Sequence, residues 1–227
     1  MMQADPIVEV ELPEIGGALR DRLAPWLERA VDLGMVGGSD PEDHVRHARG
    51  MAAAAEHVLG GQPQSFLDLG SGGGLPAMVL LAVWPTAGAY LIEASERRAD
   101  FLADEISALG WSDRAAVRRG RAEEVGHDPL LREQFPVVTA RSFGPPAVTA
   151  ECGAPFLVPG GMLVVAEPPA ADPEVRWPRA GVATVGLARG PLVRCGSVVT
   201  LQVLTKVRPS EASEPRGIGR PAKRPKF

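Results

Sequence analysis

The feature that most constrains the fold of this 227-residue chain is an apolar run that enters a glycine-rich turn and then a helix. The segment reads FLDLGSGGGLP over residues 66–76, with glycines at positions 70, 72 and 74. Glycine permits positive φ and lets the backbone approach a ligand where a Cβ atom would clash. A dinucleotide-binding G-x-G-x-x-G loop would need its third glycine at position 75, which is Leu75. The segment therefore predicts a ligand-binding loop of another kind; a turn for packing alone is the alternative.

After this segment, short apolar runs alternate with helical stretches, which is typical of a parallel sheet with crossover helices. We expect strands at 65–69, 89–93, 115–119, 137–140, 161–166, 182–188 and 197–207. The helices expected between them span 75–84, 96–109 and 145–157, with an irregular piece near 129–134. Prolines argue against a regular helix between 167 and 179. The pattern predicts an α/β fold with a mostly parallel seven-stranded sheet and helices on both faces.

Two further helices are expected before the first strand. Apolar residues recur at helical spacing from Leu12 to Met35, with breaks expected at Gly16–Gly17 and at Pro25. A second helix should begin after Asp40, which can accept a capping hydrogen bond, and end at Gly60. These boundaries divide the chain into a helical extension over residues 1–61, a core over 62–209 and a tail over 210–227.

Charge is distributed unevenly along the chain, which has a net charge of -4. The last twelve residues contain five cations and no acid, so residues 1–215 carry the opposing -9. These cations are Arg216, Arg220, Lys223, Arg224 and Lys226. A basic tail on an acidic body indicates a polyanionic partner touched at one place. A solvated, disordered terminus agrees equally well with this composition.

Other features limit the compartment and the kind of site. The two cysteines form no C-x-x-C pair, and the amino terminus lacks the apolar stretch of a signal peptide. The longest apolar run is shorter than the roughly 20 residues that a membrane span needs. His44 and His47 lie three residues apart, but no cysteine or carboxylate cluster completes a zinc site. We therefore expect a cytoplasmic protein with reduced thiols, no membrane segment and no metal.

Acidic residues beside the glycine loop indicate a ligand. The G-x-G-x-G spacing, with Asp68 just before the loop, resembles motif I of class I S-adenosylmethionine-dependent methyltransferases. The cationic amino and sulfonium groups of that cofactor favour a nearby carboxylate, which Asp68 is placed to supply. Glu93 ends the next expected strand, where a carboxylate can accept both ribose hydroxyls. The resemblance therefore implies S-adenosyl-L-methionine as the cofactor.

Several segments together resemble one family, the bacterial RsmG (GidB) methyltransferases, which methylate N7 of a guanine in small-subunit (16S) ribosomal RNA. The similar segments are DLGSGGGLP, IEASERRADFL, GRAEE, TARSFGP, APFLVPGGMLVV and the terminal PRGIGRPAKRP. They cover residues 40–167 and the tail. The resemblance implies a Rossmann-like class I methyltransferase fold, in which residues 62–209 bind the cofactor, and a ribosomal RNA or small ribosomal subunit as partner.

The resemblance also implies a role for individual residues. The cofactor would be bound by Asp68, Gly70, Gly72, Gly74, Leu75, Glu93, Ala122, Glu123 and Arg141. Arg141 would also be the catalytic residue, near the methyl-transfer site and facing RNA; a salt bridge within the fold is the alternative for this arginine. The five cations of the tail would bind RNA.

The chain departs from the family pattern where RNA would be contacted. Glu167 stands where the family usually has a lysine, and RHARGM replaces a His-x-x-Asp-Ser block. If the chain acts on ribosomal RNA, Glu167 should point away from the methyl group or pair with an arginine such as Arg141 or Arg176. Two alternatives remain: an RsmG-like methyltransferase for another RNA or a small molecule, and a non-catalytic paralogue that binds the cofactor or RNA.

Overall fold

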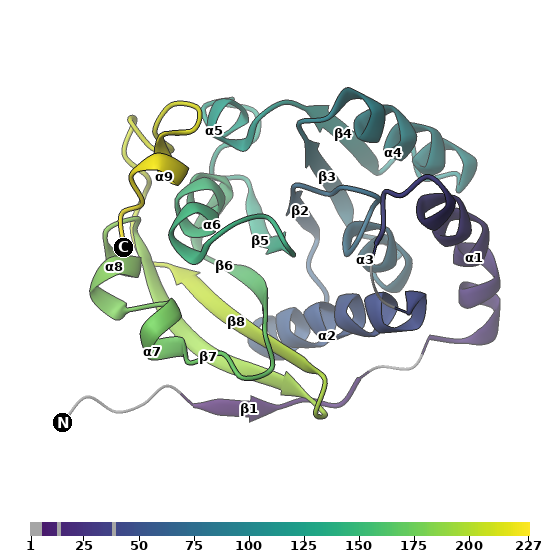
Figure 1. Cartoon of the computed structure of the whole chain (residues 1–227), viewed down its shortest axis with the longest axis horizontal. Helices are drawn as coiled ribbons and strands as arrows, with labels where there is room; N and C mark the ends of the chain where they lie inside the picture. The colour runs from purple at the N-terminus through teal and green to yellow at the C-terminus, as the bar shows by residue number, and fades with distance from the viewer. Residues whose placement is uncertain (1–5, 13–14, 38–39) are drawn as a thin grey trace.

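A computed structural model describes residues 6–12, 15–37 and 40–227 of the chain. Eight strands form one sheet in the order β1-β7-β8-β6-β5-β2-β3-β4 (Figure 1). Their bounds are β1 (Ile7–Glu9), β2 (Ser65–Leu69), β3 (Gly88–Glu93), β4 (Ala115–Arg119), β5 (Phe135–Ala140), β6 (Leu157–Glu167), β7 (Leu187–Cys195) and β8 (Val199–Lys206). Strand β8 is antiparallel to both of its neighbours, and the other pairs are parallel. The expected α/β class and mostly parallel sheet are confirmed.

Helices lie on both faces of this sheet. Their bounds are α1 (Gly17–Asp32), α2 (Pro41–Leu59), α3 (Ala77–Val83), α4 (Glu96–Ala108), α5 (Ala122–Val125), α6 (Pro146–Gly153), the 3₁₀ turn η1 (Ala154–Phe156), α7 (Pro173–Arg176), α8 (Arg179–Ala183) and α9 (Arg220–Lys223). Successive strand residues enter different hydrophobic clusters, as Phe66 and Leu67 do, because side chains alternate across a strand. One cluster includes residues of α1 to α4, and the other includes residues of α5, α6 and α8.

The signals expected at the ends of α2 are confirmed. The Asp40 side chain accepts a hydrogen bond from the backbone N–H of Glu42 at 3.0 Å, and Pro41 occupies the first helical position. Gly60 ends the helix with φ +75°, a conformation that favours glycine. None of the described helices is long and apolar enough to cross a membrane.

The structure corrects three local predictions. Helix α1 continues through Pro25, because its buried Trp26 and Ala30 hold it against the core despite the lost backbone hydrogen bond. The strand expected at 182–188 is wrong: α8 ends inside that range at Ala183, a turn follows, and β7 begins only at Leu187. That strand extends past Gly190 and Pro191 with a shift of register between Arg189 and Leu192. Four short elements were missed, the edge strand β1 and the single turns α5, α7 and α9. Residues 1–5, 13–14 and 38–39 of the expected extension lie outside the described residues.

Candidate active site

The glycine loop follows β2, and each of its three motif glycines has positive φ: +65° at Gly70, +55° at Gly72 and +104° at Gly74. A Cβ atom at Gly70 would lie 2.8 Å from the Phe143 ring, and one at Gly74 would lie 2.6 Å from Met78. At Gly72 the nearest atom would be 3.9 Å away. Packing thus requires the first and third glycines, whereas Gly72 faces open space that a ligand could fill.

A cavity of about 290 Å³ lies against this loop. Its lining residues are Met35, Val36, Gly37, His44, Gly70, Ser71, Gly72, Gly73, Leu75, Arg98, Arg141 and Ser142. The cavity therefore collects four of the predicted cofactor residues, namely Gly70, Gly72, Leu75 and Arg141. The other five, Asp68, Gly74, Glu93, Ala122 and Glu123, are not among the residues that line it. We refer to it below as the loop cavity.

The amino-terminal helical region forms one wall of the loop cavity. Buried Trp26 of α1 donates a hydrogen bond from Nε1 to the carbonyl of Gly73 at 2.9 Å. A Cβ atom at Gly73 would lie 2.8 Å from Val36, in the segment that follows α1. The loop is thus held from outside the motif, by residues of the amino-terminal region such as Trp26, which precedes Gly73 by 47 positions. The extension is part of the site.

Asp68 is fully buried at the end of β2, beneath the loop. Its Oδ1 accepts a hydrogen bond from the Thr139 hydroxyl at 2.6 Å, whereas Oδ2 has no partner among the described residues. Burial raises the pKa of Asp68 to about 6, although the hydrogen bond from Thr139 opposes that shift. A buried carboxylate oxygen without a partner is costly, and a cationic group placed against it would remove that cost.

Glu93 ends β3 and connects two loops. Its Oε2 accepts a hydrogen bond from the Gly72 backbone N–H, and its Oε1 accepts one from the Ser95 backbone N–H, each at 2.8 Å. A carboxylate oxygen can accept more than one hydrogen bond, so acceptor capacity remains for ligand hydroxyls. The carboxylate lies beside the open glycine position, and its contact with a ribose stays a prediction.

Arg141 follows β5 and lines both the loop cavity and a second cavity of about 390 Å³. Its Nη2 donates a hydrogen bond to Nδ1 of His44 on α2. It forms no ion pair with any residue that the structure describes, so the alternative role for Arg141 is not what the structure shows. Sequence reasoning considered His44 only as a zinc ligand and missed this contact. The available signal was its position in helical register with Ala48 and Met51, which are buried.

The second cavity lies where β5 and β6 end and is bounded by α7. Glu167 contributes to its wall and is ion-paired with Arg176; its Oε1 also accepts a hydrogen bond from Trp177 Nε1 at 3.0 Å. The expectation that Glu167 pairs with an arginine is confirmed, with Arg176 as the partner. The Glu167 side chain is nearly inaccessible, so this pairing neutralises its charge inside the wall.

Two of the predicted cofactor residues, Ala122 and Glu123, begin α5. Ala122 is buried, and Glu123 accepts a hydrogen bond from the backbone N–H of Gly219 at 3.1 Å. Glu123 is thus joined to the carboxyl-terminal segment, a contact that no local sequence signal indicates.

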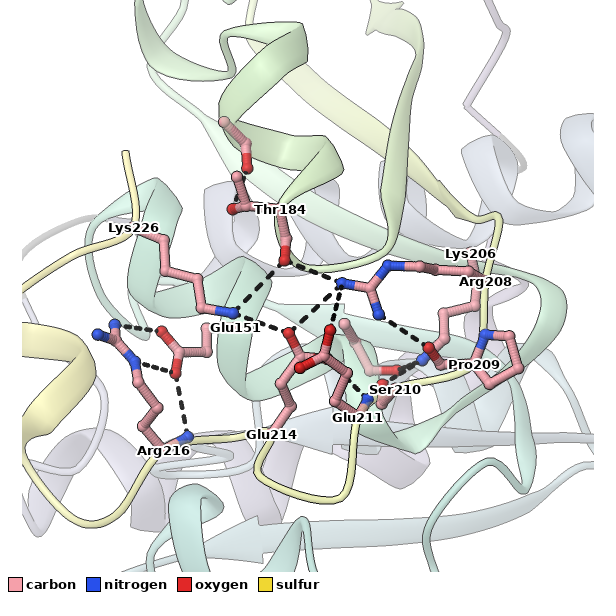
Figure 2. Close-up of polar contacts among 12 residues, drawn as sticks. Glu151, Thr184, Lys206, Arg208, Pro209, Ser210, Glu211, Glu214, Arg216 and Lys226 are labelled. Carbon is pink, nitrogen blue, oxygen red and sulfur yellow. Dashed lines mark hydrogen bonds and ion pairs between the residues drawn. The ribbon is translucent and has the colours of Figure 1, made fainter.

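Residues 210–227, the C-terminal segment, are docked on the core (Figure 2). Arg216 donates from Nε and Nη2 to the two carboxylate oxygens of Glu151, each at 2.7 Å, and Lys226 donates to Glu214 at 2.7 Å. Burial alone would raise the pKa of Glu151, but the hydrogen bonds and charge of Arg216 hold it below its usual range. The alternative of a disordered tail is therefore wrong for this structure.

The five tail cations fall into two groups. Arg216 and Lys226 are ion-paired within the fold, as described above. Arg220, Lys223 and Arg224, on and just after α9, are exposed and form no ion pair within the described part of the chain. Only the second group is available to a polyanion without a loss of internal contacts. Across the described ranges, no group of three or more histidine, cysteine or acidic side chains could hold a metal ion.

Comparisons with known proteins agree with this geometry. Residues 28–181 match the model of the family described as "GidB: rRNA small subunit methyltransferase G". A protein named ribosomal RNA small subunit methyltransferase G from Roseiflexus castenholzii is 37% identical over 170 residues, covering 73% of this chain and 72% of its own. One of the same name from Salinispora tropica is 33% identical over 233 residues, covering 90% and 94%. An O-methyltransferase from Bacillus cereus in complex with SAH superposes with a TM-score of 0.60 at 16% identity, covering 87% of this chain and 93% of its own, which supports the fold.

Proposed function

The chain belongs to the rRNA small subunit methyltransferase G family, and we propose that it methylates N7 of a guanine in small-subunit ribosomal RNA. The observation that carries this proposal is the juxtaposition of Gly72, open to a ligand, with Glu93 and Arg141 at one edge of a class I methyltransferase sheet. The protein is an S-adenosylmethionine-dependent methyltransferase. We propose that its partner is ribosomal RNA or the small ribosomal subunit, in the cytoplasm.

Our assignment of the cofactor residues follows the predicted set: Asp68, Gly70, Gly72, Gly74, Leu75, Glu93, Ala122, Glu123 and Arg141. Three features support it. The space at Gly72 is free, Asp68 has an unpartnered buried oxygen, and Glu93 keeps acceptor capacity beside the loop. When bound, S-adenosylmethionine supplies an activated methyl group on a cationic sulfur. The two acids Asp68 and Glu93 suit a ligand that has one cationic end and neighbouring hydroxyls.

Guanine N7 carries a free lone pair at neutral pH, so no proton has to leave before it is methylated. The residues of the chain therefore need to orient the base and exclude water, and a general base is not required. Guanine presents O6 beside N7 on the same edge, and arginine is the side chain that most often donates to this edge. In our proposal Arg141 donates to O6 and leaves the N7 lone pair free.

The proposed RNA contacts are Arg220, Lys223 and Arg224, with Arg216 and Lys226 holding the segment that presents them. Cations on a docked segment lose less freedom on binding than cations on a mobile tail, so fewer contacts are needed for a given affinity. Their sequence-independent attraction to phosphates would position the RNA, while the two cavities would select the reacting base.

A gene-deletion comparison tests the function. Small-subunit RNA from a deletion strain should lack one N7-methylguanine that the parent strain has, and wild-type protein should restore it. Gly72→Val protein should not restore it, because the side chain fills the open space beside the loop. An identical N7-methylguanine map in the parent and deletion strains would reject the ribosomal RNA assignment. Calorimetry with the demethylated cofactor would then decide whether the chain retains cofactor binding for another substrate.

A further inference from the structure

Arg141 lines both cavities, as its neighbour Ser142 does, and the Arg141 side chain is held by a side chain from a distant part of the sequence. Its partner His44 lies 97 residues earlier, near the start of α2. His44 is itself buried and lines the loop cavity. It also hydrogen-bonds the backbone of Gly37, another residue of the cavity wall. One imidazole thus joins Arg141, α2 and the segment that precedes α2.

The chemistry of the partners fixes the protonation state of His44. A guanidinium group can only donate hydrogen bonds, so Nδ1 of His44 must be the acceptor and must carry no proton. In the neutral ring the proton is then on Nε2. A doubly protonated imidazolium has no lone pair at Nδ1 and would place a positive charge against Arg141. The observed contact therefore exists only while His44 is neutral.

We propose that neutral His44 positions Arg141 between the two cavities, and that protonation of His44 releases Arg141 and slows methyl transfer. This inference rests on the proposed function for its second part, the effect on rate. Its first part, the contact that depends on protonation, does not depend on the substrate. His44 acts through Arg141, so it is a positioning residue.

The surroundings of His44 set the pH range in which the effect should occur. Burial, and then the charge of Arg141, lower the pKa of His44 from its usual 6.5. His47 on the same helix lowers it further, whereas the Gly37 backbone and Asp43 oppose the shift. The neutral form therefore predominates at neutral pH, and the contact should be lost only in acid. His47 is occupied elsewhere, with its Nδ1 2.8 Å from the Asp43 carbonyl.

The contact is tested first without any substrate. Imidazole ¹⁵N spectra of the full chain should show His44 with an unprotonated Nδ1 at neutral pH. Removing the guanidinium in Arg141→Ala, and separately in Arg141→Gln, should raise the pKa of His44, because a neighbouring cation is lost. His57→Gln, on an exposed turn of the same helix, identifies that ring's signals and should leave the His44 titration unchanged. A protonated Nδ1 in the wild type would overturn the proposal, as would a His44 titration unaffected by both arginine variants.

The effect on rate is tested by single-turnover methylation of small ribosomal subunits at saturating S-adenosylmethionine, from about pH 8 to about pH 5.5. Glutamine can accept from Arg141 and donate to Gly37 at every pH, so His44→Gln should approach the wild-type rate in base and exceed it in acid. We expect the ratio of the two rates to rise about fivefold or more across the range. His44→Leu lacks the contact at every pH, so it should be about tenfold slower than the wild type in base and approach the wild-type rate in acid. His57→Gln should follow the wild type throughout.

Asp68 has a pKa of about 6, which falls in the same pH range. Because Asp68 is present in both proteins, its titration affects both rates and cancels in their ratio, so the ratio reports His44 alone. A constant ratio of His44→Gln to wild type would overturn the proposal, and so would a fully active His44→Leu. Absence of wild-type methylation together with the expected spectra would reject the ribosomal RNA function and the effect on rate, while the contact would stand.

Discussion

Both ends of the chain pack against the central part of the fold, but different kinds of interaction hold them there. The region before β2 contacts the glycine loop through neutral groups, chiefly the Trp26 indole of α1 and the Val36 side chain in the segment after α1. The C-terminal segment is held on the opposite set of helices by charged groups, chiefly Arg216 on Glu151 of α6, while Lys226 pairs with Glu214 inside the segment itself (Figures 1 and 2). The first end builds the ligand cavity, and the second supports α5 and α6 while exposing cations.

The contrast changes how a basic terminus should be interpreted. Composition treats the five tail cations alike, yet two of them neutralise buried carboxylates and three face solvent. Loss of a cation in the first group should affect folding, whereas loss of one in the second should affect only a partner. Substitutions at the two ends, and in the two groups of cations, should therefore differ in the size of their effects on stability and on binding.

The largest effect is expected at the charged end. The Glu151 side chain is nearly inaccessible, and Arg216→Ala removes the cation that pairs with it. The substitution should lower the free energy of unfolding by about 3–5 kcal/mol. Denaturant unfolding at neutral pH measures it. Because the folded pKa of Glu151 lies below its usual 4.5, the wild-type advantage should persist above that pH and shrink as the pH falls below it. Arg224→Ala, which removes an exposed cation of the same segment, should stay within about 0.5 kcal/mol of wild type.

The next largest effect is expected at Gly74 of the glycine loop, with Gly72 in the same loop as its comparison. Gly74→Ala places a Cβ atom 2.6 Å from Met78 and 3.1 Å from Trp26, so it should cost about 2–4 kcal/mol of stability. Gly72→Ala meets no such obstacle and should cost about 1–2 kcal/mol for its positive φ. It should nevertheless weaken cofactor binding by about tenfold or more, since its methyl group enters the open space. Thermal unfolding measures the loss of stability in both variants, and calorimetry measures the loss of cofactor affinity. Equal losses of stability in the two variants would contradict the prediction.

Asp68, beneath the same loop, should make stability depend on pH. Its folded pKa of about 6 exceeds the ordinary 3.8, so the folded state retains the proton longer than the unfolded state does. The free energy of unfolding should therefore fall as the pH rises through this interval, by up to about 3 kcal/mol from this group. Asp68→Asn should lack that slope and bind the cofactor more weakly. Parallel slopes for the two proteins in denaturant titrations from pH 4 to about pH 7 would show that Asp68 is ionised throughout.

The smallest effect on the protein itself is expected for the exposed cations. Replacing Arg220, Lys223 and Arg224 together by alanine should reduce the slope of log affinity for RNA against log salt by roughly 2 to 3, since each phosphate contact contributes about 0.7–0.9. Cofactor affinity should not change. Arg20→Ala, an exposed cation on α1 at the other end, should leave the slope unchanged. Equal slopes for the triple variant and wild type would place the RNA contacts elsewhere.

Sequence reasoning succeeded where a structural signal is local. The glycine loop, the strands on either side of it and both ends of α2 were predicted from adjacent residues, because turns and caps depend on their own backbone chemistry. Predictions failed where contacts between residues far apart in the sequence determine the local structure. Trp26 outweighs Pro25 in α1, a register shift admits Pro191 into β7, and Arg141 meets a histidine that precedes it by 97 residues. The docking of Arg216 on Glu151 belongs to the same class, because each partner alone reads as an ordinary surface charge.

The edge strand β1 bears on the order in which the chain folds during synthesis. It pairs with β7, so that Ile7 lies opposite Leu192 and nearly the whole chain separates the two. Strand β1 emerges from the ribosome long before its partner strand β7 is made. Contacts of such long sequence separation form slowly, because a large loop has to be closed before they contribute. We expect the central parallel strands to assemble first, with the β1–β7 edge closing last.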